Sequence, residues 1–213
     1  MIALVWPDGQ YIPLPVRRWF GRVTPEEARL LRRARGPVLD VGCGPGRHVV
    51  HRLGNGTAAL GIDVSPAAAR IATRRGAAVI RRSVFDPLPG EGSWRSVLLL
   101  DGHIGIGGDP EALLTRVRTL VHPTGSVFVE FDQPGTPAAG SLARMSRADG
   151  LGPAFPWSRL AIDHGIRLAG HLGYAVREAW LAGDRWFAEL RHAESGAIGS
   201  GTRDEPILSA SRA

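Results

Sequence analysis

The sequence predicts an α/β fold, a doubly wound and mostly parallel sheet with helices on both faces. An apolar stretch at residues 38–41 leads into a turn with three glycines, and residues 38–46 read Val-Leu-Asp-Val-Gly-Cys-Gly-Pro-Gly. A second apolar stretch, residues 58–63, ends in Asp63. Further along, short apolar stretches alternate with helical patterns, which is typical of the strand–helix–strand units that build a parallel sheet.

Helices are expected where capping residues precede a helical pattern. The first begins at Thr24, where Thr24 and Glu27 can form a capping box and Pro25 suits the first turn. The expected helices cover residues 24–34, 66–75, 109–121 and 158–172. The expected strands cover residues 38–41, 58–63, 78–82, 96–100 and 126–131, followed by a hairpin that begins at residue 173, turns at 182–184 and returns over 186–191.

Two segments lack such a pattern. Residues 1–23 form an irregular lead-in rich in aromatic residues and prolines, and residues 132–157 are a Pro/Gly/Ser-rich loop with one possible short helix over 139–148. A loop of this length inside a compact domain usually has a function. We therefore expect three parts, listed by residue: a lid or lead-in with the first helix over 1–35, a ligand-binding domain over 36–192, and a disordered tail over 193–213.

The composition excludes several chemistries. The 213 residues contain no lysine, so all 26 basic side chains are arginine. The chain therefore has no phosphate-loop lysine, no Schiff base to pyridoxal phosphate and no Tyr-x-x-x-Lys pair of a dehydrogenase. Cys43 is the single cysteine, which excludes disulfides within the chain and thiolate zinc sites. We interpret Cys43 as a small residue that fills the glycine turn.

The net charge of +6 comes from dispersed arginines, and no run of five or more occurs. This pattern favours a solvated basic surface over a nucleic-acid partner, and it leaves an acidic substrate open.

No apolar stretch approaches the ~20 residues of a membrane span. The N-terminus lacks the basic and long apolar regions of a secretion signal. We expect a cytoplasmic protein without a membrane partner, and the oligomeric state stays open.

The glycine turn and Asp63 together predict a ligand site. Glycines let main-chain N–H groups approach a ligand closely, and the following helix presents its positive end. Asp63 ends the neighbouring strand, where it can accept hydrogen bonds from two ribose hydroxyls, so we expect a nucleoside-containing cofactor. The dinucleotide fingerprint G-x-G-x-x-G does not fit, because the third glycine comes one residue early and Arg47 stands in its place.

The ordered motifs resemble class I S-adenosylmethionine-dependent methyltransferases. The matching segments are residues 38–46, 61–66, 86–89, 98–102 and 123–126, the last with Thr124 in place of a glycine. The resemblance implies a Rossmann-like sheet of seven strands in the order 3-2-1-4-5-7-6, whose last two strands form an antiparallel hairpin. It also implies S-adenosylmethionine as cofactor and S-adenosylhomocysteine as product.

The resemblance further implies the cofactor contacts. These would be made by Asp40, Gly42, Cys43, Gly44, Gly46, Asp63, Val64, Ser83, Val84, Phe85, Asp101 and Gly102. Asp40 would orient the methionine amino group, Asp63 would bind both ribose hydroxyls, and Val64 would pack against adenine. Many relatives place an acid where this chain has Ser83, so either Ser83 or Asp86 would bind the adenine amino group.

Catalytic residues are expected after the strand over 96–100, which lies beside the glycine-turn strand across the switch point of the sheet. His103 is the candidate base, with Asp101 as its partner or as a cofactor ligand. A lid or substrate surface is expected from Tyr11, Trp19, Phe20, Trp157 and His164. A metal-dependent catechol-type enzyme would need a carboxylate cluster. Asp101, Glu130 and Asp132 could contribute to one, but no Asp-Asn pair follows, so no metal is expected.

We interpret the chain as a methyltransferase that acts on an oxygen or nitrogen atom of a small molecule. Two alternatives stay open: a methyltransferase for RNA or protein, and a protein that binds S-adenosylmethionine without transferring its methyl group, as a regulator or a cyclase-like scaffold.

Overall fold

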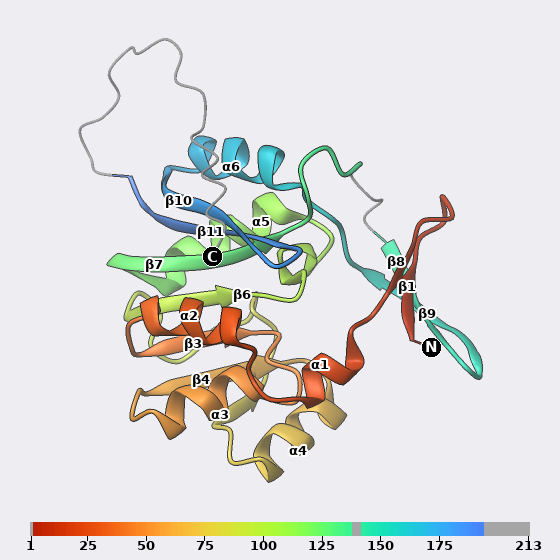
Figure 1. The fold of residues 1–213 in the computed structure, drawn as a ribbon, viewed down its shortest axis with the longest axis horizontal. Helices are drawn as coiled ribbons and strands as arrows, with labels where there is room; N and C mark the ends of the chain where they lie inside the picture. Colours follow the sequence, from red (N-terminus) through yellow and green to blue (C-terminus); the bar gives the residue numbers. More distant parts are fainter. Residues whose placement is uncertain (1, 138–141, 194–213) are drawn as a thin grey trace.

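The computed structural model describes residues 2–137 and 142–193 of the chain (Figure 1). Of the tail expected over 193–213, all but residue 193 lies outside the described residues. A seven-stranded sheet forms the centre of the molecule. Its strands are β3 (Val38–Val41), β4 (Ala59–Asp63), β5 (Val79–Arg81), β6 (Trp94–Leu99), β7 (Val121–Phe131), β10 (Tyr174–Ala182) and β11 (Arg185–His192).

The strand order confirms the expected topology. The sheet runs β10-β11-β7-β6-β3-β4-β5. When its seven strands are numbered along the chain and read from the β5 edge, this order is 3-2-1-4-5-7-6. The strands from β5 to β7 are parallel, whereas β11 pairs antiparallel with both β7 and β10. The carboxyl ends of the parallel strands therefore share one edge, and β3 and β6 are the neighbours at the switch point where a ligand crevice forms.

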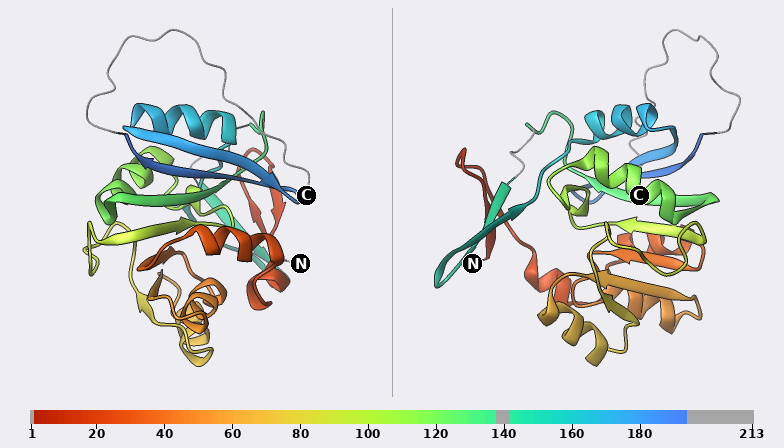
Figure 2. Two further views of the ribbon diagram at one scale, coloured as in Figure 1. Left: turned by 60° about the vertical axis from the view of Figure 1, so that its left-hand side comes forward. Right: turned by 180° about the vertical axis from the view of Figure 1, so that it is seen from behind.

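Alternate residues of the central strands bury against opposite helix layers, as the pleat requires. In β6, Val97 and Leu99 pack with α5 (Pro110–Leu120) and α6 (Ile162–His171). Leu98 instead belongs to the core on the other face, with α2 (Pro25–Arg33), α3 (Arg47–Gly54) and α4 (Pro66–Arg74). Two views of the ribbon show these helices on the two sides of the sheet (Figure 2). The continuous apolar run of β6 is thus buried on both faces.

Most helix starts follow the expected caps. The Thr24–Glu27 capping box is present at α2, and Ser65 and Asp109 accept hydrogen bonds at the starts of α4 and α5. The helix expected from Ser158 is wrong at its start, because α6 begins at Ile162. Ser158 instead donates its backbone N–H to Gly105, in the short 3-10 helix η1 (His103–Gly105). This contact draws the segment before α6 toward the end of β6.

A second, four-stranded antiparallel sheet corrects two expectations. It comprises β1 (Ala3–Val5), β2 (Tyr11–Pro13), β8 (Leu142–Arg147) and β9 (Gly150–Pro156), in the order β2-β1-β8-β9. We call it the small sheet. The lead-in is therefore not wholly irregular, and the short helix expected over 139–148 is wrong where it is described. Each segment becomes a strand through its partner: Leu4, for example, pairs with Met145.

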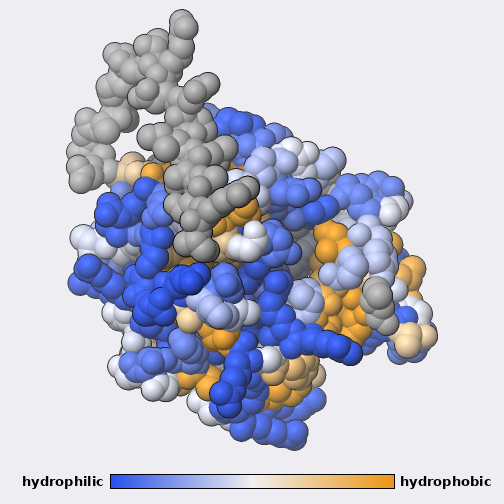
Figure 3. Space-filling view, in the orientation of Figure 1, coloured by the Kyte–Doolittle hydropathy of each residue, from blue (hydrophilic) through white to orange (hydrophobic). Residues whose placement is uncertain are grey.

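The small sheet lies to one side of the main sheet, and the short helix α1 (Val16–Phe20) links it to α2 (Figures 1 and 2). Figure 3 shows apolar surface gathered on this right-hand side of the molecule. Within the described residues, the helices are too short or too polar to cross a membrane.

Candidate functional site

A cavity of about 920 Å³ lies at the carboxyl ends of the parallel strands. The main sheet and the turns after its strands contribute Gly42, Cys43, Gly44, Asp63, Asp101, Gly102, His103, Glu130 and Phe131. On the other side, α1 and the small sheet with its flanking residues contribute Leu4, Trp6, Arg18, Trp19, Phe20, Met145, Arg147, Phe155 and Trp157. The cavity thus joins the expected cofactor crevice to the small sheet.

The glycine turn is tied to the end of the neighbouring strand. Gly44 donates its backbone N–H to one oxygen of the Asp63 carboxylate over 2.8 Å, and Ser65 donates to the other over 2.7 Å. Gly42, Gly44 and Gly46 all have positive φ, a conformation that glycine adopts without steric strain. A carboxylate oxygen can accept more than one hydrogen bond, so Asp63 keeps acceptor capacity for a ligand in the cavity.

Asp40 lies beneath the turn rather than in the cavity. It is 1% exposed, and one carboxylate oxygen lies 3.4 Å from His48 Nδ1. Although His48 directly follows the glycine turn, its side chain does not face the helix surface but is buried between Asp40 and Glu27. Burial alone would lower the pKa of His48, but the two carboxylates outweigh it and raise the pKa to about 9. His48 is therefore a buried cation at neutral pH.

Five buried charges form an ion-pair network beside the turn: Glu27, Arg47, Asp101, Glu130 and Arg185. Glu27 Oε1 accepts from Arg47 Nη2 at 2.6 Å and from Arg185 Nη1 at 2.7 Å. Asp101 accepts from Arg47 Nη1 at 2.8 Å and from Arg185 Nη2 at 3.2 Å. Arg185 also donates two hydrogen bonds to Glu130, at 2.8 and 2.6 Å. Such a network is stable only while each charge keeps its partners.

Asp101 is held in an unusual conformation by this network. It is the one non-glycine residue with positive φ (57°) among those described, and its backbone N–H donates to Glu130. Burial would raise the pKa of Asp101, but the hydrogen bonds and charge of Arg47 outweigh this effect and lower it to about 2. The carboxylate is therefore ionised at neutral pH and lines the cavity.

His103 has a different partner from Asp101. Its Nδ1 lies 2.8 Å from the Val41 carbonyl oxygen, so Nδ1 carries the hydrogen in the neutral ring and Nε2 is left as an acceptor. The ring meets Trp157 edge-on, with centroids 5.9 Å apart. A Cβ at Gly42 would lie 2.8 Å from His103 Nδ1, so this approach requires the glycine. Asp101 and His103 therefore make separate contacts, and the other expected role of Asp101, as a cofactor ligand, stays a prediction.

The residues expected around adenine lie outside the cavity lining. Val64 and Phe85 are exposed apolar side chains, at 68% and 42%, whereas Val84 is buried in the core. The Phe85 ring packs over Gly107, where a Cβ would lie 2.7 Å from it. Ser83 and Asp86 share one turn, in which Ser83 donates its backbone N–H to the Asp86 carboxylate.

Three of the five residues expected in the lid line the cavity: Trp19, Phe20 and Trp157. Tyr11 is half exposed on the small sheet, and His164 is exposed on α6, where it lies 3.7 Å from Asp163. Neither lines the cavity.

Sequence reasoning missed several charged residues of the site. In the sequence, Arg47 only breaks the dinucleotide fingerprint, and nothing local distinguishes Arg18 or Arg185 from other arginines. Arg18 Nε and the neighbouring Trp19 Nε1 are buried donors that make no hydrogen bond within the described residues, although Arg18 Nε forms an ion pair with Asp101 Oδ1 at 3.7 Å. Since buried donors are normally paired, they indicate a ligand acceptor in the cavity.

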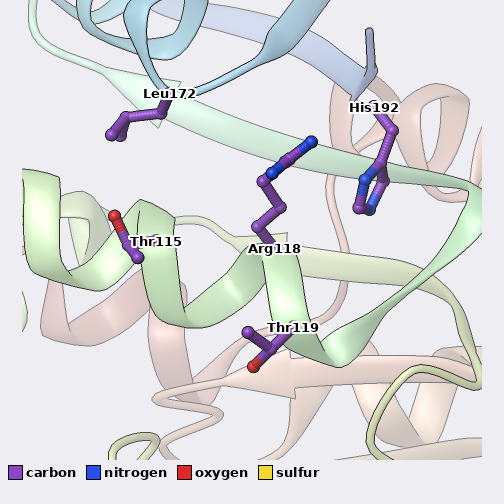
Figure 4. A pocket seen from close by; sticks show the side chains of 5 residues that line it. All are labelled: Thr115, Arg118, Thr119, Leu172 and His192. Atoms are coloured by element: carbon purple, nitrogen blue, oxygen red, sulfur yellow. The ribbon is translucent and has the colours of Figure 1, made fainter. Parts of the chain in front are cut away.

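A smaller cavity of about 320 Å³ lies between α5 and the C-terminal hairpin, lined by Thr115, Arg118, Thr119, Leu172 and His192 (Figure 4). It shares no lining residue with the larger cavity. The described residues contain no group of three or more His, Cys, Asp or Glu side chains placed to hold a metal ion.

Comparison with known proteins identifies the family. A family model described as a methyltransferase domain matches residues 16–172, and no curated protein matches the chain. This chain belongs to the class I S-adenosylmethionine-dependent methyltransferases. A solved structure of such an enzyme from Bacteroides fragilis, in complex with S-adenosylhomocysteine, is 22% identical with a TM-score of 0.73, over 90% of this chain and 87% of that one.

Two further solved structures share the fold. One is the Burkholderia thailandensis 1,6-didemethyltoxoflavin-N1-methyltransferase with its acceptor and S-adenosylhomocysteine, 20% identical with a TM-score of 0.60, over 81% of this chain and 78% of that one. The other is a sugar N-methyltransferase from a Streptoalloteichus species, 21% identical with a TM-score of 0.60, over 83% of this chain and 91% of that one. At these identities the likeness concerns the fold.

Proposed function

We propose that this chain transfers the methyl group of S-adenosylmethionine to an oxygen or nitrogen atom of a small molecule. The observation that supports this function best is the position of His103, which lines the same cavity as the glycine turn and the small sheet. The volume of about 920 Å³ is at the upper end for small-molecule sites, so a cofactor and a small acceptor can share it.

The residues present fit S-adenosylmethionine. The backbone at residues 42–46 would lie under the methionine and ribose, and Asp63 would accept from the ribose hydroxyls. Arg18 and Trp19 supply two buried donors without a hydrogen bond, one of them charged and 3.7 Å from Asp101, which suit the methionine carboxylate. The ionised Asp101 would face the methionine ammonium group, because opposite charges attract most strongly in a buried site.

On the adenine side, Val64 and Phe85 would cover the ring, because both are exposed and apolar where β4 and β5 end. Either Ser83 or Asp86 would accept from the adenine amino group. Asp40 lies outside the cavity and would act as a positioning residue through His48 and the glycine turn above it.

The cofactor supplies an electrophilic methyl group, and the protein's task is to hold the nucleophile in line and to exclude water. His103 would accept the acceptor's proton at Nε2, since Nδ1 is committed to the Val41 carbonyl. Trp157 packs against the imidazole in a T-shaped contact and would restrict its rotation. The small sheet and α1 would cover the reacting groups.

Two measurements test the proposal in sequence. Calorimetry with S-adenosylhomocysteine should give saturable binding, and labelled S-adenosylmethionine should then label members of a panel of small phenols, acids and amines. Absence of binding would overturn the proposed function. Labelling of RNA or protein alone would overturn the small-molecule acceptor, and binding without transfer to any panel would favour a non-catalytic role.

A further inference from the structure

The acceptor side of the cavity has an apolar, aromatic wall. Leu4, Trp6, Phe155 and Trp157 line it, and they belong to the apolar cluster of the small sheet. Trp6 Nε1 donates to the Trp157 carbonyl, and the Phe155 and Trp157 rings meet edge-on with centroids 6.2 Å apart. The Trp6 donor is thus already satisfied. A wall of this kind suits a flat apolar ring, and it provides few hydrogen-bond partners for the many hydroxyls of a sugar.

One positive charge on this side has no counter-ion. Arg147, at the end of β8, lines the cavity, and its guanidinium contacts the Met145 sulfur at 3.4 and 3.5 Å. No carboxylate of the described residues forms an ion pair with it within 4.0 Å. Arg159, which also lines the cavity, is by contrast paired with Asp132 at 2.8 Å. Arg147 is therefore available to an anionic group on a ligand.

We propose that the acceptor is an aromatic or heteroaromatic molecule that carries a carboxylate, an inference that rests on the proposed function. Its ring would lie against Trp157 and Phe155, its carboxylate would meet Arg147, and its ring O–H or N–H would face His103. The proton moves to His103 Nε2, and the acceptor's lone pair forms the new bond to the methyl carbon. The carbon–sulfur bond breaks, its electron pair stays on sulfur, and S-adenosylhomocysteine remains as a neutral thioether.

The test measures binding of matched probes to the protein saturated with S-adenosylhomocysteine. The probes are hydroxybenzoates and hydroxynaphthoates, each compared with its own methyl ester by calorimetry. The unmodified protein should bind the acid about tenfold more tightly than the ester, as expected for one charge-assisted hydrogen-bond pair. Arg147→Ala should abolish this ratio and leave ester binding unchanged, whereas Arg147→Lys should keep part of it.

Arg144→Ala is the matched control, because Arg144 lies on the same strand, donates to the Gly152 carbonyl and does not line the cavity. It should keep the full acid-to-ester ratio.

Equal binding of acid and ester to the unmodified protein would overturn the inference, as would binding of amino sugars in place of aromatic probes. In both cases S-adenosylhomocysteine still binds, which separates this failure from failure of the proposed function. An unchanged S-adenosylhomocysteine affinity in each variant shows that it is folded.

Discussion

Gly44 donates its backbone N–H to the Asp63 carboxylate over 2.8 Å, so the glycine turn after β3 and the acidic end of β4 form one unit. Ser65 occupies the second oxygen of the same carboxylate. The acid that we assign to the ribose thus also sets the shape of the turn that we assign to the methionine. A change at Asp63 should affect both halves of the cofactor site.

Asp63→Ala should weaken S-adenosylhomocysteine binding by at least about tenfold, because hydrogen bonds to a charged group contribute about 1.5–3 kcal/mol each. Asp63→Asn should lose less, since its amide oxygen still accepts. Calorimetry measures both. Asp8→Ala, at an exposed turn where Asp8 pairs with Gln10, serves as control and should leave the affinity unchanged. Equal heats for Asp63→Ala and the unmodified protein would exclude Asp63 from the site.

Gly42→Ala should displace His103. The new Cβ would lie 2.8 Å from the ring Nδ1 and φ is +72°, so we expect a loss of about 2–5 kcal/mol in unfolding free energy. The control is Gly56→Ala, where φ is +71° but no atom lies within 4 Å of the Cβ; it should lose only about 1–2 kcal/mol. Denaturant unfolding of both variants measures the difference. If the two variants lose similar amounts of unfolding free energy, the His103 ring moves away from the new Cβ without an energetic cost.

Arg18→Ala should remove recognition of the methionine carboxylate. The unmodified protein should bind S-adenosylhomocysteine about tenfold more tightly than the same molecule without its carboxylate, and Arg18→Ala should bind the two equally. Arg17→Ala, on the neighbouring exposed position of α1, should keep the ratio. If Arg18→Ala weakens both ligands by the same factor, Arg18 supports the site without contacting the carboxylate.

His48 should make stability depend on pH. Its pKa is raised from 6.5 to about 9 in the folded protein, so its stabilisation is fully present below pH 6.5 and is lost as pH rises through 9. A shift of this size corresponds to about 3 kcal/mol in unfolding free energy. The difference in unfolding free energy between the unmodified protein and His48→Asn, followed from pH 6 to pH 10, should shrink accordingly. A constant difference would show that His48 does not change charge in this range.

The sequence was sufficient to predict the strands of the main sheet and the glycine turn with Asp63, because these follow from local chemistry, whereas the strand order was implied by the resemblance to a known family. Acids and glycines at strand ends, a capping box and a buried apolar run each depend on residues close together in the chain. His103 and Trp157 could also be predicted from local sequence. His103 is a titratable residue just after the strand expected over 96–100, and Trp157 is an aromatic residue at the end of the loop expected over 132–157.

Only the tertiary structure decided which charges meet and what covers the site. Arg185 and Glu27 lie 158 positions apart in the chain, and no local pattern pairs them. The strands of the small sheet have little pattern of their own, and they form because β1 pairs with β8, which lies more than 130 residues away in the chain. Asp101 was expected as the partner of His103 or as a cofactor ligand, and only the fold shows that its carboxylate accepts hydrogen bonds from Arg47 and Arg185. Burial and long-range pairing, which depend on the whole fold, set the acceptor side of this site.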